Sequence, residues 1–565
     1  MRLLRGLCVL YILCGLGFPA FAIDREAFTF TNYDLSIRVE PEQQRLAVRG
    51  KITLRNDSAS PQKNIALQIS STLDWRSIQF SGKPVQFLSH PYTSDLDHTG
   101  ALTEAIVTLP TEVPPRSSIE LEIAYEGIIP LDATRLTRIG MPEDKAKHSD
   151  WDQISKSFTA VRGIGYVTWY PVATESANLS EGSSVDETIG RWKTRSSDAA
   201  MTVVFESTQD ASIFFNGAAA QVGANLPKAA FTISRSGIGA PTFVIADYQK
   251  LVADNTLTIQ YLPGQDEAAK AVAETAVLLE PPVPVVDGAE NLQILGLPDP
   301  DASPFVSDGM LLRPLASPIT NEAVLSIVYA KARNRVRSRR AWIQEGLAHY
   351  AQAAFIETQE SRRIAIDYIK AHNALLLEAE KQTATTSGGQ AEHSLINAPN
   401  DLYLQTKAMY VWWMLRDMLG RLPNDALLAY RSAEDKDPAY LQRLIEKAAH
   451  LDLQWFFDDW VYRDRGLPDF RIVSVYPRRT VNAGYMVTVT VENLGGAGAE
   501  VPVTLRFGTD EVTKRLQVAA KSQASIRIET ASVPQEAIVN DGSVPESDTT
   551  NNTYKVDLPP ETAGP

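Results

Sequence analysis

The sequence predicts a multidomain α+β protein with an N-terminal antiparallel β-domain, a helical domain and a C-terminal β-sandwich. Three observations support this prediction. The chain has 565 residues, which is enough for several domains. Its apolar residues first alternate with a period of two, then follow a helical period, and then alternate again. Apolar residues make up 44% of the chain, a share that permits a large core.

The N-terminus has the pattern of a secretory signal peptide. Arg2 and Arg5 precede an apolar run from Leu7 to Phe18, and Ala20-Phe21-Ala22 is a small-x-small cleavage site. The run is too short for a spanning helix, which needs about 20 residues. We therefore expect export to remove residues 1–22, and we expect the mature protein to be secreted or periplasmic.

Composition excludes several classes of function. Both cysteines, Cys8 and Cys14, lie inside the predicted signal peptide, so the mature chain has no disulfide, thiolate zinc ligand or catalytic thiol. The net charge of −14 makes the protein a poor general binder of nucleic acid. No later segment has the apolar length of a transmembrane helix. We expect no nucleic-acid partner and no membrane span in the mature chain.

Residues 23–250 are predicted to form the N-terminal β-domain. Apolar residues alternate with polar ones in several runs, for example Leu35, Ile37 and Val39. Turn-rich stretches such as Asn56-Asp57-Ser58 separate these runs. This pattern is typical of half-buried antiparallel strands.

Residues 251–465 are predicted to form the helical domain. Asp266–Glu280 has an amphipathic helical pattern, and the prolines that begin at Pro281 end it. One strand, Leu292–Leu297, follows. From Pro318 to Tyr462 nearly the whole chain has a helical pattern.

Residues 466–557 return to the period of two and are predicted to form a β-sandwich. The Asp- and Asn-rich ending, Asn540 to Tyr554, resembles that of bacterial cell-adhesion-type β-sandwich modules, which bind or space rather than catalyse. Residues 558–565 are predicted to be a disordered tail.

The most informative segment is Ala341–Tyr350, which contains Trp342, Glu345, Gly346 and Tyr350. It resembles the Trp-Leu-x-Glu-Gly-Phe-Ala-x-Tyr segment of the aminopeptidase N-like zinc metallopeptidases, which are gluzincins. Three further segments resemble that family in the same order along about residues 28–510: Trp169-Tyr170-Pro171, Tyr403–Arg416 and Trp455–Pro468. The resemblance implies a thermolysin-like helical domain and an immunoglobulin-like C-terminal sandwich. It also implies that Glu345 stands at the third zinc-ligand position.

The family's other ligands are the histidines of a His-Glu-x-x-His helix, whose spacing puts both on one face with the catalytic Glu between them. The family's spacing places the two histidines at Glu322 and Ser326, and the catalytic Glu at Ala323. The family's transition-state Tyr falls at Gln405. Tyr403 is nearby, but two residues along a helix turn it about 200° away. The zinc site is therefore predicted to be degenerate, with no catalytic residue and no metal ligand.

Two other features have alternative interpretations. Glu345 and His349 are spaced i, i+4 and could share a metal, or Glu345 could make a helix hydrogen bond beside a partly exposed His349. The second feature is a run of five arginines. It could bind an anionic partner or a peptide carboxylate, or it could be a solvated surface paired with acidic residues. The run consists of Arg333, Arg335, Arg337, Arg339 and Arg340.

The favoured hypothesis is a secreted or periplasmic pseudopeptidase that binds a peptide or protein partner and has no cofactor. Tyr403, Gln405 and His349 are its candidate binding residues. One alternative is an active zinc aminopeptidase with a rearranged site. The other is a structural or interaction protein of the cell envelope.

Overall fold

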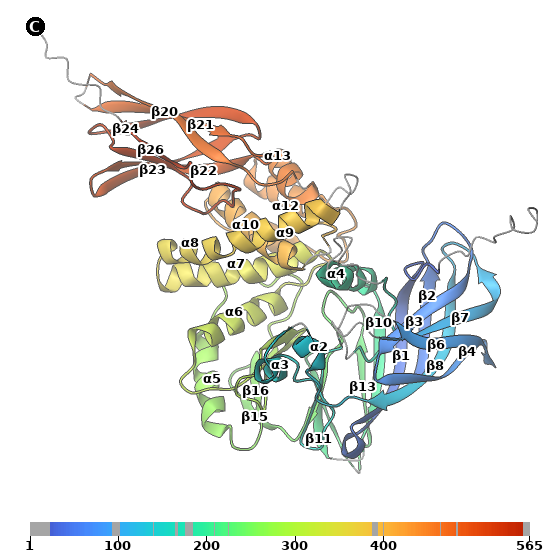
Figure 1. The fold of residues 1–565 in the computed structure, drawn as a ribbon. Helices are drawn as coiled ribbons and strands as arrows, with labels where there is room; N and C mark the ends of the chain where they lie inside the picture. The colour runs from blue at the N-terminus through green and yellow to red at the C-terminus, as the bar shows by residue number, and fades with distance from the viewer. Residues whose placement is uncertain are drawn as a thin grey trace, which may run out of the picture.

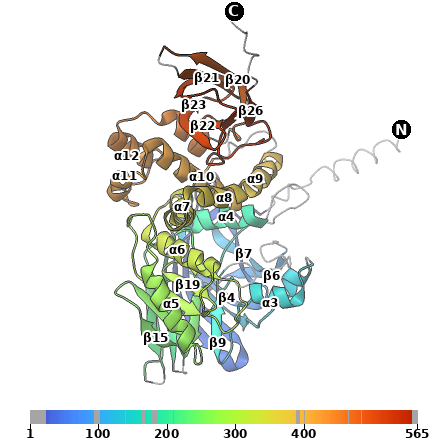
Figure 2. The same ribbon diagram turned by 90° about the vertical axis from the view of Figure 1, so that its left-hand side faces the viewer.

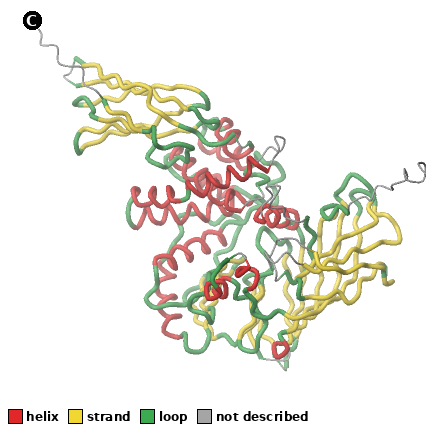
Figure 3. The backbone as a smooth tube through the Cα atoms, viewed as in Figure 1, coloured by secondary structure: helices red, strands yellow, loops and turns green. Residues whose placement is uncertain are grey.

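The computed structural model describes residues 23–92, 102–138, 140–163, 168–175, 185–207, 210–223, 225–386, 394–398, 401–463, 465–481 and 484–556. The predicted signal peptide, residues 1–22, and the predicted tail, residues 558–565, lie outside these ranges. The chain is a multidomain α+β protein in which strand-rich regions lie at the two ends and most helices lie between them (Figures 1 and 3). None of the described helices is long and apolar enough to cross a membrane.

The N-terminal region contains three sheets. The seven-stranded sheet has the order β13 (Lys228–Ile233), β10 (Ala200–Glu206), β1 (Phe28–Glu40), β2 (Arg45–Asn56), β8 (Ser118–Ile128), β4 (Leu73–Phe80), β5 (Lys83–Pro84). The three-stranded sheet has the order β3 (Gln62–Ser70), β7 (Leu102–Val113), β6 (Gln86–Tyr92). The four-stranded sheet has the order β12 (Ala218–Val222), β11 (Ala211–Phe215), β14 (Phe243–Ala246), β9 (Phe158–Val161).

The predicted period-two runs of this region lie in strands. Leu35, Ile37 and Val39 are buried along β1, between exposed or half-buried neighbours. Most strand pairs are antiparallel, as predicted, but β1 and β10 run parallel. One buried apolar cluster joins residues of all three sheets, which makes them a continuous body.

A five-stranded sheet follows, with the order β15 (Gln249–Val252), β16 (Leu257–Tyr261), β17 (Leu292–Gly296), β19 (Met310–Arg313), β18 (Phe305–Ser307). The sequence predicted only the strand at 292–297 in this part of the chain, so that prediction was incomplete. The missed strands are three to five residues long. Such short apolar runs cannot be separated from helix or loop by periodicity alone. The predicted domain boundary at 250/251 falls inside β15.

The helices lie mainly between Asp266 and Tyr462. The shorter ones near the N-terminal sheets are α2 (Thr134–Arg138), α3 (Glu143–Ser149), α4 (Val185–Ser196) and the 3-10 turn Pro41–Gln43. The others are α5 (Asp266–Leu278), α6 (Asn321–Arg335), α7 (Ala341–Gln359), α8 (Arg362–Ala371), α9 (Asn373–Thr386), α10 (Asp401–Leu419), α11 (Asn424–Ala429), α12 (Tyr440–Ala449), α13 (Gln454–Phe457) and the π-turn Asp458–Tyr462. Figure 2 shows the layer that contains α7 to α12 between the N-terminal sheets and the C-terminal strands.

The C-terminal region has two sheets. One has the order β20 (Phe470–Arg479), β21 (Tyr485–Asn493), β24 (Ser522–Thr530). The other has the order β23 (Asp510–Val518), β22 (Ala499–Phe507), β25 (Glu536–Val539), β26 (Thr553–Lys555). Apolar residues of these strands belong to the same buried cluster as the helices. At the junction, Trp460 Nε1 donates to Gly498 O at 2.7 Å, and Gly498 N donates to Asp459 Oδ2 at 2.9 Å.

A buried carboxylate organises the loop between β25 and β26. Glu546 is 1% exposed, and its Oε1 accepts hydrogen bonds from the side-chain amides of Asn540 and Asn552. Its Oε2 accepts from Phe470 N at 3.1 Å. Asn373, at the start of α9, donates to the backbone oxygen of Glu546. Burial raises the pKa of Glu546 to about 7, although the amide donors act in the opposite direction.

This raised pKa predicts a pH-dependent stability. The folded pKa lies above the ordinary value of 4.5, so stability is complete below pH 4.5 and is lost as the pH rises through about 7. The full loss is at most about 3 kcal/mol. Glu546→Gln mimics the protonated form, so we expect it to raise the free energy of unfolding at about pH 8 and to leave it nearly unchanged at about pH 5. Urea unfolding at both pH values measures this, with exposed Glu529→Gln as the control. Equal pH dependence in the parent and Glu546→Gln would contradict the prediction.

Candidate functional site

The candidate site lies where α6 packs against α7. Glu345 of α7 is buried, and both of its carboxylate oxygens are bonded to side chains of α6. Arg333 Nε donates to Glu345 Oε1 at 2.8 Å, and the Tyr329 hydroxyl donates to Glu345 Oε2. Arg333 Nη1 also donates to Asp308 Oδ1 at 2.8 Å, from the turn between β18 and β19. Glu345 is thus held by a cation and a hydroxyl that the chain itself supplies.

Electrostatics keep this cluster charged. Burial by itself raises the pKa of Glu345, but Arg333 and the Tyr329 hydroxyl outweigh burial, so the pKa lies below its ordinary value. Burial disfavours the charged guanidinium of Arg333, but Glu345 and Asp308 more than compensate and raise its pKa. Burial raises the pKa of Tyr329 well above its ordinary value, and the charge of Glu345 acts in the same direction. The site therefore holds a buried ion pair with a neutral phenol beside it.

This geometry corrects the register that the sequence suggested. Tyr329 and Arg333, not Glu322 and Ser326, are the residues of α6 that contact Glu345. Ser326 instead accepts a hydrogen bond from Arg313 Nη1 at 2.6 Å. Glu322 lies in the exposed first turn of α6, and Ala323 is buried with its backbone nitrogen capped by Thr320. The sequence register placed the site about two helical turns too early.

The residues around Glu345 do not fit a zinc ion. Zinc in proteins is held by histidine, cysteinate and carboxylate ligands. Here the oxygens of Glu345 are occupied by Tyr329 and Arg333. Two other residues of that kind lie near α6, but Asp308 is bonded to Arg333 and His349 lies near the ring of Tyr329. A guanidinium has no lone pair to donate, and its positive charge repels a metal cation. The donor set suits an internal ion pair and not a metal site.

The packing of α10 sets the opposite wall of the site. A Cβ at Gly346 would lie 2.7 Å from Ala408 Cβ and 2.8 Å from Trp412 Cδ1, so glycine after Glu345 lets α10 approach α7 closely. Gln405 of α10 lines the cavity next to Glu345. Tyr403 does not line it. Its hydroxyl accepts from Lys407 Nζ at 2.8 Å in the buried core.

A cavity of about 190 Å³ lies beside Glu345, and we name it the Glu345 cavity. It is lined by residues of α4, α6, α7 and α10, by the segment 238–240 and by β18. Lys193 Nζ of α4 and Asp401 Oδ2 of α10 form an ion pair across its rim at 2.7 Å. Helical and β-sheet parts of the chain thus both contribute walls, so a ligand there would contact both.

His349 is not part of this cavity wall. Its ring lies 4.8 Å from the ring of Tyr329, and its Nδ1 is 3.1 Å from Gln352 Oε1. Its Nε2 is buried, and no hydrogen-bond partner for it is found within the part of the chain that the structure describes. Burial lowers the pKa of His349, despite the opposing effect of Glu345. His349 and Glu345 share no ligand position, because both oxygens of Glu345 are directed to α6.

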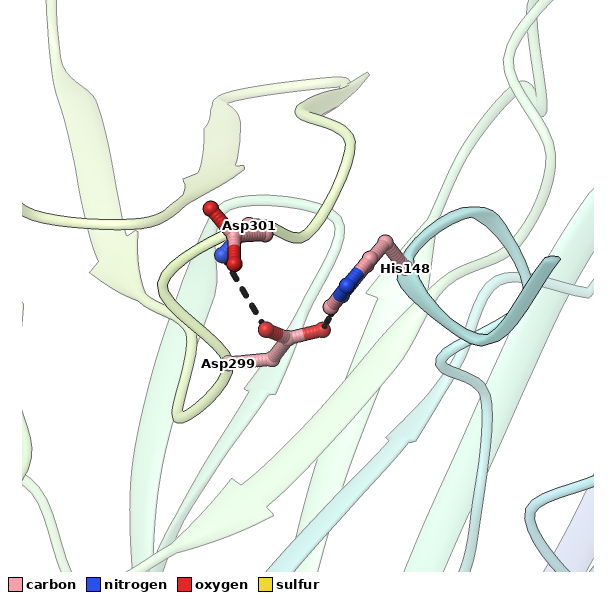
Figure 4. A group of neighbouring side chains, drawn as sticks. All are labelled: His148, Asp299 and Asp301. Atoms are coloured by element: carbon pink, nitrogen blue, oxygen red, sulfur yellow. Dashed lines mark hydrogen bonds and ion pairs between the residues drawn. The ribbon is translucent and has the colours of Figure 1, made fainter. Parts of the chain in front are cut away.

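A second cluster of possible metal ligands was not foreseen from the sequence. His148 at the end of α3 lies next to Asp299 and Asp301, in the loop after β17 (Figure 4). One ligand atom from each lies within 4.8 Å of the others. His148 Nδ1 and Asp299 Oδ2 are already hydrogen-bonded at 2.6 Å, and this bond raises the pKa of His148. As described, the cluster is an ion pair that joins α3 to the loop, and none of the three residues lines the Glu345 cavity.

Sequence reasoning missed Tyr329, Arg333 and Asp308 as site residues. The available signal was the i, i+4 spacing of Tyr329 and Arg333, which puts both on one helix face. The arginine run is mostly paired with acidic residues. Beyond Arg333, the pairs are Arg335 with Glu280 and Glu290, Arg339 with Asp198, and Arg340 with Asp435.

Comparisons with known proteins add little to this picture. No protein-family model matches the chain, and no curated protein matches it. Among solved structures, a point mutant of an M1 zinc metallopeptidase from Deinococcus radiodurans aligns with 79% of this chain and 96% of its own length. The two sequences are 16% identical, and the TM-score is 0.46. This similarity is too low to assign a family or an activity to the chain.

Proposed function

We propose that the chain is an exported, non-catalytic relative of the aminopeptidase N-like metallopeptidases that binds a peptide or a segment of a protein partner. The observation that carries this proposal is the occupation of Glu345 by Arg333 and Tyr329. In the family that the sequence resembles, the same helix crossing holds a metal between two histidines and a glutamate. Here a guanidinium supplies the positive charge next to Glu345, which supports a site without a metal-activated water.

The remaining parts of the proposal rest on the sequence and on the cavity. The signal-peptide pattern of residues 1–22 supports export, which N-terminal sequencing of secreted material would test. The resemblance supports a thermolysin-like arrangement of the helices and an immunoglobulin-like C-terminal sandwich. The Glu345 cavity, with Gln405 and the Lys193–Asp401 pair on its wall, supports a ligand with polar groups.

We expect the purified mature protein to contain far less than one zinc per chain and to hydrolyse no aminoacyl substrate. The reason is that Arg333 blocks the coordination position next to Glu345. Elemental analysis after dialysis against trace zinc measures the content, and an aminopeptidase assay in the same buffer measures turnover. One tightly held zinc per chain, with activity that a chelator removes, would instead support the rearranged-site enzyme.

We expect peptide binding to depend on the Glu345 cavity. Gln405→Trp should fill the cavity and weaken binding of a captured peptide by at least ~10-fold, or about 1.4 kcal/mol. Leu402→Trp is the matched control, because residue 402 is exposed on the same helix and does not line the cavity. Selection from a random peptide library, followed by titration of both variants, makes the measurement. Failure to select any peptide would favour the structural role.

A further inference from the structure

A second cavity, of about 220 Å³, lies on the other side of Arg333, and we name it the Arg337 cavity. It is lined by the end of β13, the following segment to Gly237, the β11–β12 hairpin, Asp308, Gln344, and residues between 333 and 338 other than Arg335. Arg333 lines both cavities and therefore lies between them, whereas its partner Asp308 lines the Arg337 cavity alone. The segment 234–240 runs along both cavities, since Ser234–Gly237 contributes to one and Ile238–Ala240 to the other.

The Arg337 cavity is basic in a protein of net charge −14. Its charged lining residues are Arg235, Arg333 and Arg337 against a single carboxylate, Asp308, which is bonded to Arg333. Arg235 uses its Nε to bind Asp198 at 2.7 Å. Arg337 is exposed, and no hydrogen bond or ion pair of its side chain is found among the described residues. It is the exception in the arginine run, whose other members all have acidic partners.

The shape of the cavity indicates what kind of anion it takes. Its volume is below the ~300–1,000 Å³ of pockets that enclose a drug-sized ligand, so it accepts one end of a larger molecule. Phe231, Thr232 and Ile233 of β13 form part of the wall, and β13 is one of the two edge strands of the seven-stranded sheet as described. An edge strand offers unpaired backbone groups to an extended peptide. An arginine fork matches a carboxylate with two parallel hydrogen bonds.

We propose that the Arg337 cavity binds the C-terminal carboxylate of an extended peptide, with Arg337 as its principal ligand and Arg235 as a second cation. This inference rests on the proposed peptide-binding function and names the end of the peptide that is recognised. A peptide anchored there can follow the segment 234–240 past the Arg333–Asp308 pair toward Glu345. Arg333 then has a double role, because it holds Glu345 on one side and lines the carboxylate site on the other.

The test compares two probes on the mature chain, N-acetyl-Ala-Ala-Ala with a free carboxylate and the same peptide as its C-terminal amide. Dissociation constants come from ligand-observed NMR titrations. We expect the free acid to bind at least ~10-fold more tightly than the amide, which is about 1.4 kcal/mol. Arg337→Gln should reduce the affinity for the acid to that for the amide. Arg339→Gln is the matched control, because it removes the same charge two residues away, outside the cavity lining.

Each other outcome has a definite meaning. If the acid and the amide bind equally well, or if Arg337→Gln still prefers the acid over the amide, the proposed carboxylate site is wrong. The proposal that the protein binds peptides is not affected by either result. Binding of the acid that needs Arg337 but is unaffected by Gln405→Trp supports the carboxylate site and counts against the Glu345 cavity as the peptide site. Inorganic phosphate is titrated alone. If phosphate binds in an Arg337-dependent way and the acid peptide does not, the site is an inorganic-anion site and the proposal fails.

Discussion

Replacing Arg333 with methionine is expected to destabilise the protein by about 3–5 kcal/mol, the usual loss when one partner of a buried ion pair is removed. The side chains of Arg333 and Glu345 are only 6% and 9% exposed, so water solvates Glu345 much less well than the guanidinium does. Asp308 also loses its partner, but at 29% exposure its carboxylate can be solvated. The main loss therefore comes from Glu345.

The pH dependence of this loss identifies its cause. In the parent protein the pKa of Glu345 lies below 4.5, so the group adds stability above that pH, and this is lost as the pH falls through the folded pKa. Arg333→Met removes the largest effect that opposes burial and leaves the hydrogen bond from Tyr329, so we expect the pKa of Glu345 to rise above 4.5. Ionised Glu345 then reduces stability, and the variant recovers part of its deficit as the pH falls. Urea unfolding of both proteins at about pH 8 and about pH 5 measures the difference.

Two further variants control this experiment. Arg333→Met combined with Glu345→Leu removes the whole pair, and we expect it to be more stable than Arg333→Met alone, because no buried charge is left unpaired. Arg333→Lys keeps the charge but lacks the separate nitrogens with which Arg333 bonds to Glu345 and Asp308, so its loss should be intermediate. A deficit in Arg333→Met that is the same at both pH values would show that packing, and not Glu345, causes the loss.

The second large effect is expected from Tyr329→His combined with Arg333→His. These two positions are one turn apart on α6, and both side chains contact Glu345 in the parent. The double variant would present two imidazoles and a carboxylate, which is a zinc donor set. We expect zinc affinity to rise at least ~100-fold over the parent, or about 2.8 kcal/mol. Zinc should also raise the melting temperature of the variant, since a ligand that binds only the folded state stabilises it.

The matched control is Glu322→His combined with Ser326→His, the pair suggested by the sequence register. It adds the same two imidazoles to the same helix, but the structure places Ser326 against Arg313 and not against Glu345. We expect no gain in zinc affinity from this pair. A gain in the control but not in the Tyr329–Arg333 pair would mean that α6 lies in the other register.

The sequence predicted the face of α6 that contacts Glu345, but it placed the contact residues about two helical turns too close to the start of the helix. Positions 322, 326, 329 and 333 lie on one helix face, because the two pairs differ by about two helical turns. Helical periodicity therefore could not choose between them, and the choice relied on the spacing known for another family. The connection from α6 to α7 at 336–340 fixes the answer, and its conformation depends on contacts such as the backbone bond from Val286 N to Arg335 O. Such contacts join distant segments and leave no local trace in the sequence.

Other parts of the fold were predicted to different degrees. The β, helical and β order follows directly from hydrophobic periodicity, and the period-two runs do lie in strands such as β1 and β21. The five-stranded sheet was largely missed because its strands are short. Tyr403 and Gln405 point in different directions because two residues along a helix differ by about 200°. This difference was predictable, and Gln405 but not Tyr403 lines the cavity. The partners of Arg333, Arg335, Arg339 and Arg340 were not predictable, because their six acidic partners come from separate parts of the chain between residues 198 and 435.

The shared core between the helices and the C-terminal sandwich also has a consequence for orientation. Trp460 and Asp459 are both bonded to Gly498, and Asn373 holds the loop that contains Glu546. With these contacts in place the sandwich does not swing independently of α9 and of the segment 458–462, so the sandwich and the helices move as one rigid body. A surface or filament that binds the C-terminal sandwich would therefore also fix the orientation of the Glu345 cavity. A partner arriving from solution would then meet the cavity at a constant angle.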